Sequence, residues 1–309
     1  MERWHGVGSR PPDWDGCVVT IGVFDGVHRG HQAIIGRAVE RARVLGVPAV
    51  VVSFDPHPVE VLRPGTHPAL LTSLDHKAEL IEACGVDVLC VQPFTREFSQ
   101  LAPEQFVREF LLQGLAARAV VIGTNFRFGA RAAGDLTLLA RLGDVWGFEV
   151  DGVQMASDGE MRFSSTTVRE LIETGDVAAA HRMLGRPHRV TGVVVRGDAR
   201  GRELGFPTAN VETVRYTAVP ADGVYAGYLI RVGPQRLPAA VSVGTNPTFA
   251  GTERRVEAHV LDWNGDLYGE HVGVEFACHL RAQVRFEQVD DLRAQIAADV
   301  EATRRALLP

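Results

Sequence analysis

The stretch GVFDGVHRGH, residues 22–31, decides the fold of the first half of the chain. It connects a mostly apolar run, 17–21, to a segment in which Ile34, Ala38 and Ala42 recur with helical spacing. This pattern predicts a strand, a glycine turn and a helix. Glycine lets the turn adopt positive φ and lets the backbone approach a ligand, and the first N–H groups of the helix point into the opening. The stretch therefore predicts an anion site.

Two histidines strengthen this interpretation. His28 and His31 are three residues apart, so at the start of a helix they share a face and can reach one anion. An imidazole can carry a proton near neutral pH, so the pair suits the phosphates of a nucleotide. Purely steric or surface roles remain open, as does half of a zinc site, although no further ligands stand at a familiar spacing. The stretch matches neither GxGxxG nor GxxxxGK[ST].

Composition limits the class of protein. The 309 residues are 46% hydrophobic and 23% charged, which is typical of a globular chain long enough for two domains. The net charge of −6 argues against a nucleic-acid partner. No apolar run has the length of a membrane span or the form of a leader peptide. The spacing of four cysteines fits no disulfide or metal framework and favours a reduced, cytoplasmic setting: Cys17, Cys84, Cys90 and Cys278.

Strands and helices alternate through the first half. PAVVVSF (48–54), VDVLCVQPF (86–94) and AVVIG (119–123) have the composition of buried strands, and patterns of helical period lie between them. Such alternation predicts an α/β domain with a Rossmann-like, doubly wound parallel sheet. Residues 1–15 are polar and are expected to form a loose lead-in.

Two motifs follow the ends of predicted strands, where open parallel sheets bind their ligands. In FDPHP, Phe54 and His57 are candidates for stacking on an aromatic ring system, and the alternative is a proline-rich turn that supports the sheet. GTNFRFG, residues 123–129, offers an amide, a cation and two aromatic faces. We expect one of its two phenylalanines to lie in the core.

A serine- and threonine-rich segment, RFSSTTVRELIETGD, closes this half. Ser164, Ser165 or Thr166 is expected to cap a helix. Arg162 and Arg169 flank the cap, so the segment could grip a triphosphate and not merely start a helix.

The pattern changes after about residue 185. From Val190 onward, short strand-like segments are separated by glycine and proline turns, and one helical pattern follows at about 290–307. We expect two domains, 1–185 and 186–309. The second is predicted to be a small antiparallel β-barrel with a terminal helix, with a sandwich as the alternative.

GRELGFPTAN, which ends at Asn210, is the distinctive stretch of the second half. Gly201 and Gly205 can bring backbone amides to phosphate. Thr208 and Asn210 are two apart on a predicted strand, so we expect them to face the same side and to offer oxygen ligands for Mg²⁺. An ordinary bulge followed by a strand is the alternative.

Glu257 interrupts the strand pattern RRVEAHVL, with His259 on the same face. A carboxylate inside a barrel is costly unless it is paired or takes part in chemistry, so a general base is one interpretation. A solvent-facing position on an alternating strand is the other.

Taken together, the chain from about Gly16 to Leu307 resembles the bifunctional riboflavin kinase/FAD synthetase family. The motifs that carry the resemblance are GVFDGVHRGH, FDPHP, GTNFRFG and SSTTVR, then GRELGFPTAN, PADGVYAG, GTNPTF and VEAHVLD with DLYG. The resemblance implies that the first domain joins FMN to the AMP of ATP and releases pyrophosphate. It implies that the second domain phosphorylates riboflavin with ATP. Riboflavin, FMN, FAD and Mg²⁺ with ATP are the expected small molecules.

The resemblance also implies residue roles. His28 and His31 would stabilise charge on the ATP phosphates, and Glu257 would take the proton of the ribityl hydroxyl. Together with the residues argued above, the candidates for ATP binding are Gly22, Phe24, Asp25, Gly30, Asn125, Arg162, Ser165, Thr166 and Arg169 in the first domain, and Gly197, Gly201, Gly205 and Pro207 in the second. The flavin candidates are Phe54, His57 and Phe128, with Arg285 and Phe286 where the family has a mobile loop. Thr208 and Asn210 would hold Mg²⁺.

One position departs from the family pattern, because Arg196 stands where a histidine is often expected. A chain with only one of the two activities, a flavin carrier without catalysis and another HxGH transferase are the rival hypotheses. Intact phosphate and metal motifs argue against a carrier, and PTAN argues against another transferase. The sequence predicts no oligomeric state.

Overall fold

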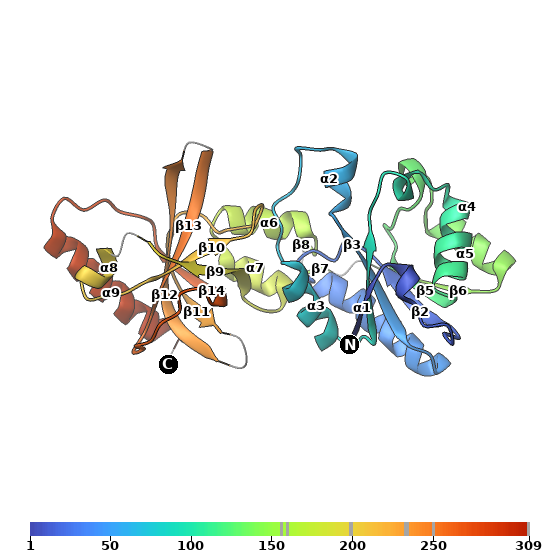
Figure 1. Ribbon diagram of the computed structural model, residues 1–309, viewed down its shortest axis with the longest axis horizontal. Coiled ribbons are helices and arrows are strands. Elements are labelled where there is room, and N and C mark those ends of the chain that lie inside the picture. The colour runs from blue at the N-terminus through green and yellow to red at the C-terminus, as the bar shows by residue number, and fades with distance from the viewer. Residues whose placement is uncertain (155–156, 159–160, 198–199, 232–234, 249–250, 308–309) are drawn as a thin grey trace. The chain divides into compact units, whose positions relative to one another are not determined.

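The computed structural model describes residues 1–154, 157–158, 161–197, 200–231, 235–248 and 251–307 (Figure 1). The chain forms two compact units. The first contains Met1–Pro68 and Leu74–Ser164, and the second contains Ala69–Ser73 and Ser165–Pro309.

The first unit is built on a parallel sheet of six strands, in the order β1-β4-β3-β2-β5-β6. The doubly wound α/β prediction is therefore confirmed. The strands are β1 (Glu2–His5), β2 (Cys17–Ile21), β3 (Ala49–Asp55), β4 (Val88–Pro93), β5 (Ala117–Gly123) and β6 (Glu149–Val153), with a small pair β7 (Ser157–Asp158) and β8 (Met161–Arg162). The helices are η1 (Val7–Ser9), α1 (Arg29–Leu45), α2 (Pro58–Leu62), α3 (Leu74–Ala83), η2 (Phe98–Gln100), α4 (Pro103–Gln105), the π-helical η3 (Phe106–Gly114), η4 (Ala130–Ala132) and α5 (Leu136–Trp146).

The central strands are apolar because both faces of the sheet are covered. Successive side chains of a strand point to opposite faces. Accordingly, Val19 belongs to an apolar cluster with Phe106 and Phe110, whereas Val18 belongs to a cluster with Ile35. The sheet therefore has two cores, one on each face.

The expectation of a loose lead-in over 1–15 is wrong in part. Glu2–His5 forms the edge strand β1, which pairs in parallel with β4, and Trp4 is only 5% exposed. Trp4 packs edge-on against Trp14, with ring centroids 4.8 Å apart. Two indole rings thus fix the start of the chain to the sheet.

The second unit contains a closed antiparallel barrel in the order β10-β13-β12-β11-β14-β9. The barrel prediction is confirmed, and the sandwich alternative is excluded. The strands are β9 (His188–Val195), β10 (Ala209–Thr213), β11 (Gly223–Ile230), β12 (Arg236–Thr248), β13 (Gly251–Val260) and β14 (His271–Arg281). The helices are α6 (Ser165–Glu173), α7 (Val177–Leu184), a short α8 (Arg200–Glu203) that the sequence did not lead us to expect, and α9 (Val289–Leu307).

Alternate residues of each barrel strand fill the interior. Tyr225 and Phe276 are fully buried there and meet edge to face, with ring centroids 5.3 Å apart. The terminal helix α9 packs against β11, β12 and β14, as the helical pattern at 290–307 predicts.

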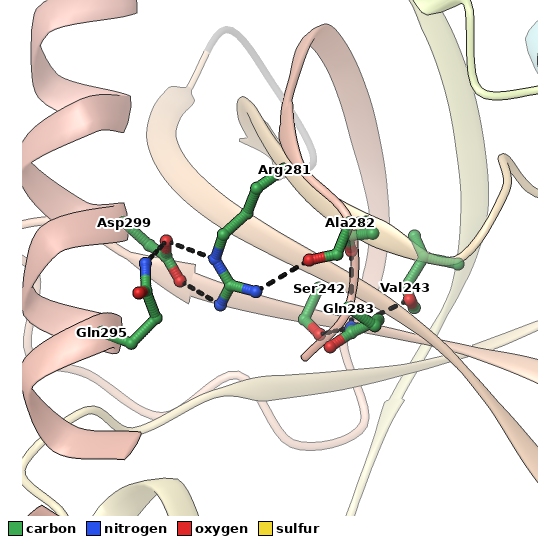
Figure 2. Close-up of polar contacts among 8 residues, drawn as sticks. Ser242, Val243, Arg281, Ala282, Gln283, Gln295 and Asp299 are labelled. Carbon is green, nitrogen blue, oxygen red and sulfur yellow. Dashed lines mark hydrogen bonds and ion pairs between the residues drawn. The ribbon is translucent and has the colours of Figure 1, made fainter. Parts of the chain in front are cut away.

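Polar contacts fasten α9 and the segment before it to the barrel (Figure 2). Arg281, at the end of β14, donates from Nε and Nη2 to the Asp299 carboxylate at 2.8 and 2.7 Å. Gln295 also donates to Asp299, at 2.9 Å. Gln283 donates to Ser242 Oγ at 2.9 Å and to the Val243 carbonyl at 3.0 Å. The start of the segment 282–288 is thereby tied to β12.

Candidate active sites

Three of the sequence motifs lie at one edge of the parallel sheet. GVFDGVHRGH follows β2, FDPHP begins within β3, and GTNFRFG starts at the end of β5. Because β3, β2 and β5 are adjacent and parallel, their carboxyl ends meet at the same edge. The strand order also reverses at β2, which is where open α/β sheets bind ligands. The structure thus brings the three motifs together, as predicted.

The turn after β2 has an unusual backbone. Gly26 has φ +81°, and two residues with side chains also have positive φ: Phe24 at 49° and Val27 at 37°. A β-branched residue such as Val27 rarely adopts this conformation. Strained positions of this kind cluster at functional sites and persist only where surrounding contacts hold them.

His28 and His31 are brought together at the start of α1. His28 is the N-cap of the helix, and its Nδ1 accepts a hydrogen bond from the His31 N–H at 3.3 Å. The two rings stack with centroids 3.6 Å apart, and Phe24 meets His31 edge-on. A Cβ on Gly30 would lie 3.1 Å from the His28 ring, so this glycine makes room for the imidazole.

The electrostatic environment of His31 disfavours its charged form. Burial of the His31 ring, the neighbouring His28 and the Lys77 ammonium lower the pKa of His31 well below its usual 6.5. His31 is thus neutral at pH 7 in the ligand-free chain, unlike the pair of titrating imidazoles expected from the sequence. Its Nδ1 is buried and has no hydrogen-bond partner within the described residues. A ligand atom at this position would satisfy it.

The other candidates in this turn surround the histidines. Gly22 lies under the Phe24 ring, where a Cβ would approach within 3.1 Å. Asp25 is 1% exposed and Phe24 2%, so both are enclosed by the turn. Sequence analysis missed Lys77, whose Nζ donates to the Val23 carbonyl at 2.9 Å. Its signal was its uniqueness, because the chain contains no other lysine.

The flavin candidates of the first unit lie in different settings. Phe54 is half-buried and meets the Phe94 ring edge-on, with centroids 5.4 Å apart. His57 caps α2, and its Nδ1 accepts from the Val59 N–H at 3.1 Å, a local role in the helix that the sequence did not lead us to expect. Phe128 is 5% exposed and packs on Phe106. A flavin role for these three residues stays a prediction.

GTNFRFG divides its side chains between core and solvent. Phe128 is the core phenylalanine, whereas Phe126 is half-buried and stacks on it with centroids 5.8 Å apart. Asn125 is exposed after the end of β5, and Arg127 pairs with Asp135 at 3.3 Å. Phe126 therefore offers the more accessible ring, a distinction that alternation in the sequence could not make.

The triphosphate candidates are divided between the two units. Arg162 is exposed on β8 in the first unit. Ser165 begins α6 and Thr166 follows it, in the second unit. Arg169, also on α6, donates from Nε to the Ala69 carbonyl at 2.6 Å. Their role in nucleotide binding stays a prediction.

The barrel unit groups a second set of polar residues. Asn210 on β10 pairs in register with Glu257 on β13, and Thr208 Oγ1 donates to Glu257 Oε2 at 3.4 Å. Glu257 lies between the buried Val256 and Ala258, so it faces outward from the barrel and is partly exposed. Glu257 is thus an outward member of an alternating strand, which was the alternative, and it also contacts a motif threonine. Its role as a general base stays a prediction.

Glycines shape the stretch beside this cluster. A Cβ on Gly197 would collide with the Asn210 amide, and one on Gly201 would collide with the Phe206 carbonyl. Gly205 has φ +89°. The backbone at these positions therefore depends on the absence of a side chain, as expected for a loop that approaches a ligand.

Two cavities adjoin the cluster. One of about 230 Å³ is lined by Pro207 and Thr208 and by the apolar or aromatic Trp263, Leu267 and Tyr268. The Arg196 guanidinium lies 5.7 Å from the Tyr268 ring centre. The other, of about 1030 Å³, is lined by Gly197 and Asn210 and carries five arginines against two glutamates: Arg169, Arg196, Arg215, Arg254 and Arg255, with Glu173 and Glu212. This excess of cationic groups suits a phosphate-bearing ligand.

The last two candidates lie between β14 and α9. Arg285 is exposed and Phe286 is half-buried. Gln283, two residues earlier, is bonded to β12, and α9 begins three residues after Phe286 (Figure 2). The structure fixes both ends of this segment and leaves its centre at the surface. The motif GTNPTF extends to residue 249, which lies outside the described residues.

Comparison with known proteins identifies both halves. Residues 10–167 match the model of the FAD synthetase family, and residues 184–307 match that of the riboflavin kinase family. The chain is 41% identical over 302 residues to the bifunctional riboflavin kinase/FMN adenylyltransferase of Escherichia coli K12, covering 97% of this chain and 95% of that one. It belongs to the bifunctional riboflavin kinase/FMN adenylyltransferase family.

Further relatives agree with this assignment. The family member from Pseudomonas fluorescens is 40% identical over 311 residues, covering 100% of this chain and 99% of that one. The crystal structure of a macrolide-efflux protein from Streptococcus pneumoniae matches with a TM-score of 0.88 at 34% identity, over 98% of each chain. The resemblance drawn from the motifs is thus confirmed over nearly the whole chain. In the part of the chain that the structure describes, no helix has the length and hydropathy to cross a membrane.

Proposed function

We propose that this chain makes both flavin coenzymes from riboflavin. Its barrel unit transfers the γ-phosphoryl group of ATP to riboflavin and gives FMN. Its α/β unit joins FMN to the AMP part of ATP and gives FAD and pyrophosphate. The family assignment of each half supports this proposal, and so do the two polar clusters described above.

Adenylyl transfer is assigned to the turn after β2. A phosphate oxygen of FMN attacks the α-phosphorus of ATP, the bond from that phosphorus to the bridging oxygen breaks, and pyrophosphate leaves with the electron pair. His28, His31 and the N–H groups at the start of α1 stabilise the charge that builds up on the phosphates. The remaining nucleotide contacts within this unit are assigned to Gly22, Phe24, Asp25, Gly30, Asn125 and Arg162. A nucleotide role for Ser165, Thr166 and Arg169, which belong to the second unit, stays an expectation from the resemblance.

Phosphoryl transfer is assigned to the cluster on β10 and β13. Glu257 accepts the proton of the ribityl hydroxyl as that oxygen attacks the γ-phosphorus, and ADP leaves. The Thr208 hydroxyl, which donates to Glu257, orients the carboxylate. The loop with Gly197, Gly201, Gly205 and Pro207 contacts the nucleotide.

The donor set of the barrel cluster fits Mg²⁺, which prefers hard oxygen ligands. Asn210 pairs in register with Glu257, and the hydroxyl of Thr208, the residue just before β10, donates to the Glu257 carboxylate. We assign Thr208 and Asn210 to the ion. When bound, Mg²⁺ would neutralise charge on the nucleotide phosphates.

Flavin contacts are assigned on both units. In the α/β unit they are Phe54, His57 and Phe128, with Phe126 as the more accessible ring. In the barrel unit they are Arg285 and Phe286. Aromatic faces suit the planar isoalloxazine, and a guanidinium can stack on it.

The working environment follows from the substrates. ATP, riboflavin and FMN are the partners, and we propose a cytoplasmic enzyme that needs neither nucleic acid nor a membrane. Cys17, Cys84, Cys90 and Cys278 are all free thiols, which agrees with a reduced compartment.

The observation that carries the proposal is the presence of two complete polar clusters in one chain, the stacked His28 and His31 in one unit and Thr208, Asn210 and Glu257 in the other. Incubation of the purified chain with riboflavin, ATP and MgCl₂, followed by chromatography, should give FMN and then FAD. FMN alone, or FAD formed only from added FMN, would leave one activity. Bound riboflavin with no product would indicate a carrier and would refute the proposal.

We propose further that the kinase domain begins near residue 186. The helices before this point pack with the barrel, since α7 contacts β9 and β14 and buries Met183 and Leu184. Fragment 186–309 should therefore phosphorylate riboflavin, and fragment 165–309 should do so with a higher melting temperature. An inactive shorter fragment beside an active longer one would move the start of the domain to α6.

A further inference from the structure

Lys77 is the only lysine of the chain, and it is buried. It lies on α3 and is 6% exposed. Lysine is among the residues least often buried, because removing an ammonium from water is costly unless it is paired and hydrogen-bonded. A lysine buried at this position therefore requires a structural or functional explanation.

The hydrogen bonds of Lys77 converge on one backbone atom. Nζ donates to the Val23 carbonyl at 2.9 Å and lies 3.4 Å from Ser53 Oγ. Ser53 Oγ itself donates to the same carbonyl at 3.1 Å. Two side chains, one from α3 and one from β3, therefore fix the Val23 carbonyl from outside the turn.

Val23 is the second residue of GVFDGVHRGH. The residue after it, Phe24, has φ 49°, and Val27 has φ 37°. Gly26, between them, has φ +81°, which a glycine adopts without strain. A backbone strained at Phe24 and Val27 needs contacts that hold it. Gln32, at the start of α1, donates to the Val27 carbonyl at 2.9 Å. Lys77 and Ser53 hold the Val23 carbonyl from α3 and β3.

Charge links the same lysine to the turn and to the histidines. Burial lowers the pKa of Lys77, and the Asp25 and Asp55 carboxylates act against this effect. Asp25 belongs to the turn and is 1% exposed. The ammonium also acts on His31, which faces His28 from the same turn. Lys77 thus sits among the charged groups of the turn.

We propose that Lys77 is a positioning residue for adenylyl transfer: by fixing the Val23 carbonyl, it holds the turn in the shape that presents His28, His31 and the first N–H groups of α1 to the nucleotide. The inference rests on the proposed function of the turn. In this role Lys77 does not touch the reacting atoms. Its effect reaches them through the backbone.

Two variants separate charge and hydrogen bonding from packing. Lys77→Met keeps an unbranched side chain as far as Cε and removes the ammonium. Ile81→Val removes one methylene from the same helix at a fully buried position and leaves the bonds to Val23 intact. If Lys77 positions the turn, Lys77→Met should lower kcat for FAD formation from FMN by about 10- to 100-fold, with a smaller change in KM for ATP. Ile81→Val should lower the melting temperature and leave kcat within about twofold.

The second measurement uses the wild-type chain, so it does not depend on whether a variant folds. Labelling with lysine enriched in ¹⁵N at Nζ gives one side-chain signal, because there is one lysine. We expect this signal to shift on saturation with α,β-methylene-ATP.

The outcomes are distinguishable. A wild-type chain that makes no FAD from FMN would refute the proposed function. A wild-type chain that makes FAD, while Lys77→Met keeps its kcat or the Nζ signal does not move with the nucleotide analogue, would refute the role of Lys77 alone.

Discussion

The two units present their polar clusters in opposite ways. In the α/β unit the groups are enclosed: His28 and Asp25 are each 1% exposed, Lys77 is 6% exposed, and the backbone between them is strained. In the barrel unit, Asn210 and Glu257 lie on regular strands, Thr208 lies just before β10, and all three are partly exposed. One site is therefore a shaped turn with side chains locked inside it. The other is a set of side chains held on or next to hydrogen-bonded barrel strands.

This difference indicates which substitutions should impair each reaction. A site made from a turn depends on glycines and on contacts behind the turn, so residues that touch no substrate affect it. In the barrel, Asn210 and Glu257 depend mainly on their own side chains, because the strands hold their register without them, whereas the loop beside them depends on Gly197, Gly201 and Gly205. We therefore expect large losses of activity when the catalytic side chains of the barrel are replaced. In the turn, we expect such losses also when glycines or supporting residues are replaced.

The largest expected effect is at the barrel carboxylate. Glu257→Gln should lower kcat for FMN formation by roughly 10³-fold, because the amide cannot accept the proton of the hydroxyl. Steady-state kinetics with riboflavin and ATP measures this loss. FAD formation from supplied FMN on the same sample is the control and should be unchanged. Undiminished FMN production would remove Glu257 as the base.

A pair of glycines in α1 tests the turn. Gly30→Ala places a Cβ 3.1 Å from the His28 ring, whereas a Cβ on Gly36 meets nothing within 4 Å. Gly30→Ala should lower FAD formation by about 10²-fold by displacing the imidazole, as His28→Ala should by removing it. Gly36→Ala should keep full activity and stabilise the helix by up to about 1 kcal/mol. Equal activity in the two glycine variants would contradict the account of an enclosed site.

The ion pair between Arg281 and Asp299 joins β14 to α9, and its removal tests how much this contact stabilises the barrel unit. The side chains of Arg281 and Asp299 are 22% and 9% exposed, and Asp299→Asn leaves the guanidinium poorly paired. We expect a loss of about 2 kcal/mol in the free energy of unfolding of the barrel unit. Chemical denaturation followed by circular dichroism measures it. Glu301→Gln, on the exposed side of the same helix, should change stability by less than about 0.5 kcal/mol.

The smallest effect is a pH dependence specific to the turn. The pKa of His31 is lowered in the folded chain, so between that pKa and 6.5 the unfolded chain binds more protons than the folded chain. Stability from this group is therefore complete above pH 6.5 and falls as the pH decreases, by at most about 1.4 kcal/mol per pH unit. His31→Asn should flatten the stability of the α/β unit between pH 7 and 5. An unchanged slope would assign the dependence to other groups.

Much of the fold was predictable because three of the motifs directly follow apolar runs with the composition of strands. GVFDGVHRGH marked a strand, a turn and a helix, and β2 and α1 have those positions. The edge strand β1 was missed because its four residues are flanked by polar sequence and show little periodicity. Its stability comes from Trp4 packing on Trp14 and from pairing with β4, which are contacts distant in sequence.

The sites were predictable as residue types but not as environments. The motifs identified Glu257 and Thr208 as candidates. They did not predict that the Glu257 carboxylate accepts a hydrogen bond from the Thr208 hydroxyl. It could not distinguish the core Phe128 from the more open Phe126. Lys77 carries no local motif, and only the fold shows that its side chain is buried and bonded to the turn. Burial is a property of the assembled chain, and no single segment determines it.

The closed circuit of β10, β13, β12, β11, β14 and β9 leaves every barrel strand paired on both sides. The parallel sheet instead ends at β1 and β6, each of which has one strand neighbour among the described residues. Free strand edges are templates on which foreign chains can add, so aggregation under heat or mild denaturant should begin in the α/β unit. Charged side chains on β1, Glu2 and Arg3, would act as gatekeepers against it.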